Sequence, residues 1–175
     1  TLAELDALGV RTAVIDFTAP ATLDAAFAGA DTLVLVSGSE VGQRAVQHGN
    51  AIDAAKRAGI SRIVYTSAPA AMTSALILAP EHKATEEALV ASGVPFTILR
   101  NGWYNENYAA SFAQVVGTGV YLTSTGEGRV ASAARTDYAE AIAAVLTSDG
   151  HVGAVYELSG DTAWTGTAFA ADASE

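Results

Sequence analysis

Residues 94–108 read Val-Pro-Phe-Thr-Ile-Leu-Arg-Asn-Gly-Trp-Tyr-Asn-Glu-Asn-Tyr. The apolar run Phe96–Leu99 predicts a buried strand, and amides, phenols and an indole follow directly at its end. In an open α/β sheet, ligands bind in the crevice outside the carboxyl ends of the strands. The segment therefore predicts both a strand of a parallel sheet and a ligand site at the end of that strand.

Apolar runs and helical patterns alternate along the whole chain. Further strands are predicted at residues 13–17, 33–36, 62–66 and 154–158, and helices at 2–8, 20–27, 41–58, 80–92 and 137–146, the last capped by Thr136 or Asp137. Residues 163–175 start like a helix that soon ends. Such alternation is typical of right-handed βαβ units and predicts an α/β, doubly wound, Rossmann-like parallel sheet. No repeat or linker divides the chain, so we expect residues 1–175 to form a single domain.

The composition narrows the class of protein. With 175 residues and 50% hydrophobic residues, the chain is long and apolar enough to bury a sizeable core, and no apolar run approaches the roughly 20 residues of a membrane span. A net charge of −10 without a basic cluster makes nucleic acid an unlikely partner. The absence of cysteine excludes disulfides and thiolate metal sites, and the three scattered histidines predict no metal. A cytoplasmic location fits these features.

Small polar residues follow three of the predicted strands. They are Ser37-Gly38-Ser39, Thr66-Ser67 and Arg100-Asn101-Gly102. Glycines and small hydroxyls let a backbone approach a bulky ligand closely and supply hydrogen bonds to it. Each group taken singly is also common as a turn or cap. Together they predict a dinucleotide site along one edge of the sheet, provided that the strand order brings them together.

Two further candidates keep a structural alternative beside the functional one. Asp16 and Phe17 could flank an adenine by hydrogen bond and stacking, or cap a turn and fill the core. Gln43 could point its amide into the crevice, or lie exposed in the first turn of a helix.

Several motifs carry a family resemblance. Ser39-Glu-Val-Gly-Gln-Arg44 and Arg100-Asn-Gly-Trp-Tyr104 are fairly specific, and Ile63-Val-Tyr-Thr-Ser67 and Arg135-Thr-Asp-Tyr-Ala139 occur more widely. With these motifs in this order, the chain resembles the type 2 NAD(P)H:quinone oxidoreductases, an NmrA-like branch of the atypical short-chain dehydrogenases/reductases.

The resemblance implies NADPH, or NADH, as the cofactor and a small quinone-type acceptor of hydride. It implies cofactor contacts for Ser37, Ser39, Gln43, Thr66 and Ser67. It also implies that the amides of Asn101 and Asn107, with Tyr104 beside them, form the substrate pocket. Amide donors there would stabilise charge on a quinone oxygen without titrating.

Other catalytic arrangements fit less well. The Tyr-x-x-x-Lys pair of typical short-chain dehydrogenases is absent. We expect Lys83 to form a solvated ion pair with Glu87, four residues on, rather than to act as a catalyst. Asp137 is expected to cap a helix rather than to act as an acid.

The chain departs from the family pattern at its beginning, because its sequence holds no Gly-x-x-Gly-x-x-Gly turn. The resemblance therefore implies an N-terminally incomplete middle section that by itself binds NADPH weakly. The segments 13–17 and 33–36 are then expected either to pair directly or to leave one of them outside the sheet. An NmrA-like regulatory module that binds a dinucleotide without catalysis, or an inactive fragment, remains the alternative. A homo-oligomer is compatible with the sequence.

Overall fold

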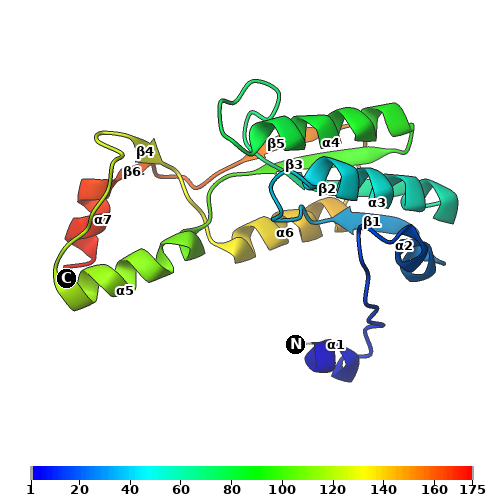
Figure 1. Ribbon diagram of the computed structural model, residues 1–175, viewed down its shortest axis with the longest axis horizontal. Coiled ribbons are helices and arrows are strands. Elements are labelled where there is room, and N and C mark those ends of the chain that lie inside the picture. Colours follow the sequence, from blue (N-terminus) through cyan, green and yellow to red (C-terminus); the bar gives the residue numbers. More distant parts are fainter. Residues whose placement is uncertain (1, 175) are drawn as a thin grey trace.

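The computed structural model describes residues 2–174, and a four-stranded parallel sheet lies at its centre (Figure 1). The strands are β1 (Thr32–Leu35), β2 (Arg62–Ser67), β3 (Phe96–Asn101) and β5 (Val155–Leu158), in the order β1-β2-β3-β5. Every neighbouring pair runs parallel. The predicted α/β fold class is confirmed, because helices cover both faces of this sheet.

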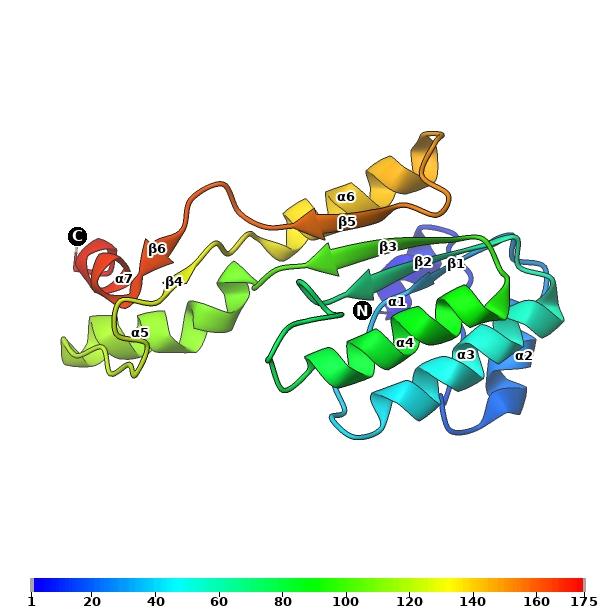
Figure 2. The ribbon, with the colours of Figure 1, turned by 90° about the horizontal axis from the view of Figure 1, so that it is seen from above.

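The helices form one layer on each side (Figure 2). One face carries α2 (Pro20–Phe27), α3 (Arg44–Ala58) and α4 (Ala79–Ser92), and the other carries α6 (Arg135–Thr147). The larger core cluster lies on the first face, where Tyr65 and Ile98 pack with Ala51 and Leu89. Among residues 2–174, no helix has both the length and the apolar composition needed to cross a membrane.

Local signals place most helix ends correctly. Helices α3 and α4 are capped by Gly59 and Gly93, both in the left-handed conformation with φ of 74°, and so end where the predicted ranges 41–58 and 80–92 end. However, α3 begins at Arg44 rather than at residue 41. Gly42 has a φ of 89°, which a right-handed helix cannot contain, and its backbone nitrogen donates to Glu81 Oε1 at 2.8 Å.

The predicted cap of α6 is wrong in position. The helix begins two residues earlier than expected, at Arg135, with Ala134 as the N-cap residue. Asp137 is the third residue of the helix, and its Oδ2 accepts a hydrogen bond from the Ala134 backbone nitrogen at 2.9 Å. Asp137 therefore does help to cap the helix, but from inside the first turn, as acidic residues do in a capping box.

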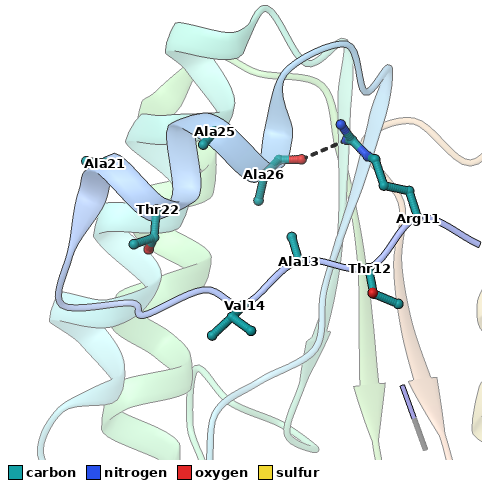
Figure 3. Close-up of a pocket in the computed structure, with 8 residues that line it drawn as sticks. All are labelled: Arg11, Thr12, Ala13, Val14, Ala21, Thr22, Ala25 and Ala26. Carbon is teal, nitrogen blue, oxygen red and sulfur yellow. Dashed lines mark hydrogen bonds between the residues drawn. The ribbon is translucent and has the colours of Figure 1, made fainter. Parts of the chain in front are cut away.

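The predicted strand at residues 13–17 is wrong. This segment is an exposed connection between α1 (Leu2–Ala7) and α2. Of the two segments 13–17 and 33–36, it is the one that lies outside the sheet. A strand needs a neighbour to pair its backbone groups, and the described chain places none beside this segment. Instead, residues 11–14 run along α2 across a hollow of about 470 Å³, and Arg11 Nη2 donates to the Ala26 carbonyl at 3.1 Å (Figure 3).

A smaller group of elements extends from the sheet beyond β3 (Figures 1 and 2). It contains η1 (Asn105–Tyr108), α5 (Ala109–Thr118), the antiparallel pair of β4 (Arg129–Val130) with β6 (Trp164–Thr165), and α7 (Gly166–Asp172). Aromatic rings hold it together, with Trp164 4.7 Å from Tyr108 and 5.6 Å from Phe169 between centroids. The helix predicted from residue 163 begins instead at Gly166, because Trp164 and Thr165 pair with β4.

Gly102, just after β3, has no room for a side chain. A β-carbon there would lie 2.9 Å from the Leu158 carbonyl oxygen and 2.9 Å from the Tyr138 hydroxyl oxygen. We predict that Gly102→Ala lowers the free energy of unfolding by about 1–3 kcal/mol, because the Leu158 oxygen also accepts the Gly102 N–H and cannot move freely. Thermal unfolding measures the change.

The matched control is Gly49→Ala in the middle of α3, where the space around the β-carbon is open. Alanine is the better helix former, so this variant should gain up to about 1 kcal/mol. A Gly102→Ala protein that melts at the temperature of the parent protein would contradict the close approach at Gly102.

Candidate functional site

The carboxyl ends of β1, β2 and β3 meet at one edge of the sheet. The Ser37 backbone nitrogen, just after β1, donates to Thr66 Oγ1 of β2 at 2.9 Å. Ser67 lies opposite Arg100 in the β2–β3 register, and Asn101 is the next residue of β3. The structure therefore brings together the three polar strand ends that the sequence singles out.

A hollow of about 610 Å³ opens beside this edge. Two segments far apart in the sequence line it, residues 15–18 of the connection before α2 and residues 38–40 of the loop after β1, together with Gln47 of α3. Four of the predicted cofactor residues thus share one hollow: Asp16, Phe17, Gly38 and Ser39. Gln43 lies exposed at the start of α3, outside the residues that line the hollow.

Asp16 and Phe17 also have structural roles. Asp16 Oδ1 accepts hydrogen bonds from the Thr18 hydroxyl at 2.6 Å and from the Thr18 backbone nitrogen at 2.7 Å, which together lower the pKa of Asp16. The half-buried Phe17 packs against the core, and its carbonyl accepts a hydrogen bond from Asn50 Nδ2 at 2.8 Å. The turn-capping and core alternatives are therefore real, and both residues still border the hollow.

Buried side chains of α3 hold the loop after β1. The Gly38 backbone nitrogen donates to His48 Nε2 at 3.1 Å, and Arg44 Nε donates to the Gly38 carbonyl at 2.8 Å. Arg44 Nη1 also pairs with Glu81 Oε2 of α4 at 2.9 Å. The loop that borders the hollow is consequently fixed by charged and polar groups from two helices.

Two buried histidines lie between the sheet and these helices. His48 Nδ1 is 3.0 Å from Thr85 Oγ1, and His82 Nδ1 is 2.7 Å from the Tyr65 hydroxyl. Burial, with the nearby positive charge of Arg44, lowers the pKa of both histidines to about 4. Burial also raises the pKa of the Tyr65 hydroxyl, so all three side chains are neutral near pH 7.

A second charged cluster lies below the ends of β2 and β3. Glu86 of α4 accepts hydrogen bonds from Ser67 Oγ at 2.6 Å and from Arg100 Nη2 at 2.6 Å. Arg100 Nη1 reaches Glu157 of β5 at 2.8 Å. The hydrogen bond with Glu86 is the main cause that raises the pKa of Arg100. The Ser67 hydroxyl thus donates its hydrogen bond to the buried Glu86 carboxylate.

Asn101 ends β3 with an amide that is 7% exposed. Its Oδ1 is buried and has no hydrogen-bond partner within residues 2–174. An unpaired buried polar atom costs about 1–3 kcal/mol, so its presence at a strand end needs an explanation.

The aromatic motif that follows Asn101 packs against the start of α6. The half-buried Tyr104 ring lies 5.2 Å from the Tyr138 ring, and the Arg135 guanidinium lies 5.4 Å from its centroid. Glu106 accepts hydrogen bonds from the Arg135 backbone nitrogen at 3.0 and 3.1 Å, and this bonding lowers the pKa of Glu106. Asn107 is exposed in η1. Of the two amides assigned to the acceptor, Asn101 is therefore buried and Asn107 lies on the surface.

Sequence reasoning missed the polar side chains that support the site: the buried Arg44, His48 and Glu86, the partly buried Glu81 and the exposed Glu157. A signal was available, because Arg44 and His48 are four residues apart on α3, as are His82 and Glu86 on α4. Such spacing puts two polar groups on one helix face, but it does not say that this face is turned inward.

Two minor predictions concern single charged residues and metals. The expected Lys83–Glu87 ion pair is confirmed, with an N–O distance of 3.9 Å between exposed side chains. In the part of the chain that the structure describes, no three histidine, aspartate or glutamate side chains come together as metal ligands.

The buried histidines predict a loss of stability in acid. Their pKa is about 4 in the folded protein and about 6.5 in the unfolded chain, so the unfolded chain binds more protons between these values. Stability is complete above about pH 6.5 and falls as the pH drops towards 4, by on the order of 3 kcal/mol for each histidine. Urea unfolding at several pH values measures this loss. If the double variant His48→Gln/His82→Gln keeps the same pH dependence, the assignment is wrong.

Residues 1–149 match the NAD(P)H-binding family. The chain is 51% identical over 168 residues to quinone oxidoreductase 2 of Escherichia coli, covering 96% of this chain and 59% of that protein. It is 30% identical over 169 residues to an NAD(P)H azoreductase of Xenophilus azovorans, again covering 96% of this chain and 59% of the relative. The chain thus spans about three fifths of the length of these relatives.

Solved structures agree with this relationship. The crystal structure of the E. coli NADPH-dependent quinone oxidoreductase in complex with NADPH matches with a TM-score of 0.94 and 49% identity, over 99% of this chain and 61% of that one. Triphenylmethane reductase of Citrobacter sp., solved with NADP(H), matches with a TM-score of 0.90 and 34% identity, over 95% and 60% of the two chains. The resemblance predicted from the sequence motifs is confirmed, and the chain belongs to the NAD(P)H-binding family.

Proposed function

We propose that the protein is an NAD(P)H-dependent oxidoreductase that transfers hydride to a quinone-type acceptor. The observation that carries this proposal is Asn101, a buried amide at the carboxyl end of β3 whose Oδ1 has no partner among the described residues. A bound ligand with an N–H or O–H group would satisfy that oxygen. The amide fits a site for two ligands, because it offers an acceptor at Oδ1 and a donor at Nδ2.

NADPH supplies the hydride when it is bound. The residues that we propose to hold it surround the hollow and the strand ends: Asp16, Phe17, Ser37, Gly38, Ser39, Gln43, Thr66 and Ser67. In support, the backbone at Gly38 is fixed by His48 and Arg44, so its neighbours face a ligand from a preset position. The E. coli and Citrobacter proteins that the chain resembles were solved with NADPH and NADP(H).

Asn101, Asn107 and Tyr104 are proposed to hold the acceptor. An amide N–H placed at the acceptor oxygen stabilises the negative charge that develops there, and it keeps the same protonation state at every pH of interest. The Tyr104 ring, flanked by Tyr138 and Arg135, offers an aromatic surface for a planar ring. Water can protonate the hydroquinone anion, so the proposal needs no general acid.

The direct test is NADPH consumption with a simple quinone as the acceptor. Because the sequence holds no Gly-x-x-Gly-x-x-Gly turn and weak NADPH binding is expected, we expect slow oxidation of NADPH that depends on the quinone concentration. Binding of NADPH without turnover would favour the alternative, a regulatory module that only senses the dinucleotide. An aromatic azo compound should be tried in parallel, because one relative is an NAD(P)H azoreductase.

The proposal also concerns the surroundings of the protein. Because NADPH is a cytoplasmic reductant, we propose a cytoplasmic location. A small quinone-like molecule is the proposed partner, and size-exclusion chromatography with light scattering will measure whether copies of the protein associate.

We predict that Asn101→Ala lowers quinone turnover by about 10²–10³-fold, because one preorganised donor to the acceptor oxygen is lost. The affinity for NADPH should stay nearly unchanged. Steady-state kinetics and an NADPH binding titration measure these two effects separately.

The matched control is Asn105→Ala. Asn105 is exposed, and its backbone nitrogen, which alanine keeps, donates to the Ala133 carbonyl at 2.9 Å. Turnover of this variant should therefore equal that of the parent protein. An equal loss of NADPH affinity in Asn101→Ala would make Asn101 a cofactor residue and would contradict its assignment to the acceptor.

A further inference from the structure

Gly38 is held at both of its backbone groups by side chains from α3. Its N–H donates to His48 Nε2 at 3.1 Å, and its carbonyl accepts from Arg44 Nε at 2.8 Å. His48 is fully buried and Arg44 is 3% exposed. The N–H belongs to the Ser37–Gly38 peptide and the carbonyl to the Gly38–Ser39 peptide, so neither of these two consecutive peptides, which border the hollow, can turn without breaking one bond.

The directions of the hydrogen bonds fix the protonation state of His48. A backbone N–H can only donate, so Nε2 must carry no proton, and the ring proton is on Nδ1. Nδ1 then donates to Thr85 Oγ1 at 3.0 Å, and Thr85 Oγ1 donates to the Glu81 carbonyl at 2.9 Å. The Glu81 carboxylate pairs with Arg44, which closes a ring of hydrogen bonds through Gly38. Only the neutral imidazole with its proton on Nδ1 lets every donor and acceptor in this closed set of hydrogen bonds find a partner.

We propose that His48 is a positioning residue for the dinucleotide: its unprotonated Nε2 sets the Ser37–Gly38 peptide, and with it the loop from Ser37 to Ser39, in the orientation that binds the cofactor. The inference rests on the proposed function, because it assigns a role to His48 in that same site. Protonation of Nε2 removes the acceptor of the Gly38 N–H and sets two donors face to face. The charged form of His48 therefore releases the loop.

The groups that face His48 come from four parts of the chain. Arg44 lies one turn before it on α3, the Tyr65 ring of β2 is 5.5 Å away, and the Phe17 ring is 6.4 Å away. Helix α4 contributes Thr85, which bonds to Nδ1, and His82, while the nearby carboxylates of Glu81 and Glu86 pair with Arg44 and Arg100. Burial and the positive Arg44 therefore prevail and lower the pKa of His48 to about 4, so the neutral form predominates at higher pH.

His82 provides a matched control in the same layer. It is buried to a similar degree, and the same causes lower its pKa to about 4. Its Nδ1 bonds to the Tyr65 hydroxyl rather than to the loop after β1. A change at His82 therefore disturbs the core without touching Gly38, which separates positioning of the loop from general stability.

The test compares His48→Phe, His48→Gln and the control His82→Gln. Phenylalanine keeps the ring volume but offers no acceptor to the Gly38 N–H, whereas glutamine places a neutral acceptor oxygen at about the reach of Nε2. The first measurement is hydrogen exchange of the Gly38 amide by NMR, which needs no cofactor. The second is an NMR titration with NADP⁺, which also measures weak binding, at pH values from 7 down to about 4.

We expect His48→Phe to speed exchange of the Gly38 amide by at least about tenfold and to raise the dissociation constant for NADP⁺ about tenfold, equivalent to about 1.4 kcal/mol. His48→Gln and His82→Gln should keep both values near those of the parent protein at pH 7. As the pH falls towards 4, the parent protein should lose affinity by a component that is missing in His48→Gln. Protonation of the cofactor phosphate acts equally on both proteins and cancels in the comparison.

Unchanged Gly38 exchange in His48→Phe, or an unchanged dissociation constant, overturns the proposal. If His48→Phe does not fold, the decision rests on pH: identical pH profiles for the parent protein and His48→Gln overturn it, and a flatter profile for His48→Gln supports it. Failure of the parent protein to bind NADP⁺ at any concentration overturns the proposed function itself. That outcome is recognised before any variant is compared.

Discussion

Parallel backbone pairing of β1, β2 and β3 is the constraint on which the rest of the structure depends. It ends the three strands at one edge of the sheet, where Thr66 accepts the Ser37 N–H and Asn101 follows at the end of β3. It also sends alternate side chains of β2 to opposite faces, so that Tyr65 and Ser67 both meet α4. A shift of one residue in this register would turn each of these side chains to the opposite face of the sheet, and the site would not form.

Ion pairs beneath that edge, most of them buried, hold the loops in place. Arg44 pairs with Glu81 on one side, and Arg100 bridges Glu86 and Glu157 on the other. Removing one partner of a buried pair costs about 3–5 kcal/mol, a range that applies to Arg44–Glu81 and Arg100–Glu86 but not to the half-exposed Glu157. Glu157 also accepts the Ala70 backbone N–H at 3.1 Å, and Ala70 has a φ of 47°, a conformation that a residue with a side chain adopts only when it is held.

The sequence predicts what depends on local chemistry and misses what depends on distant neighbours. Glycines after helices, apolar runs and polar strand ends are local signals, and they place α3, α4, β2 and β3 within a few residues. The segment 13–17 has the composition of a strand but no partner in the described chain, and partnership cannot be read from the segment itself. The roles of His48 and Glu86 were missed for the same reason: a polar residue on a helix is expected to face water unless the fold turns it inward.

The central claim is that a nicotinamide dinucleotide lies across the carboxyl ends of β1, β2 and β3, with its reactive end beside Asn101. A crystal structure of the protein with NADP⁺ tests this claim most directly. We expect the dinucleotide in the hollow bordered by Asp16 and Gly38, and a hydrogen-bond donor of the ligand on Asn101 Oδ1. A dinucleotide bound elsewhere, with Asn101 Oδ1 paired only to a structural water, would contradict it.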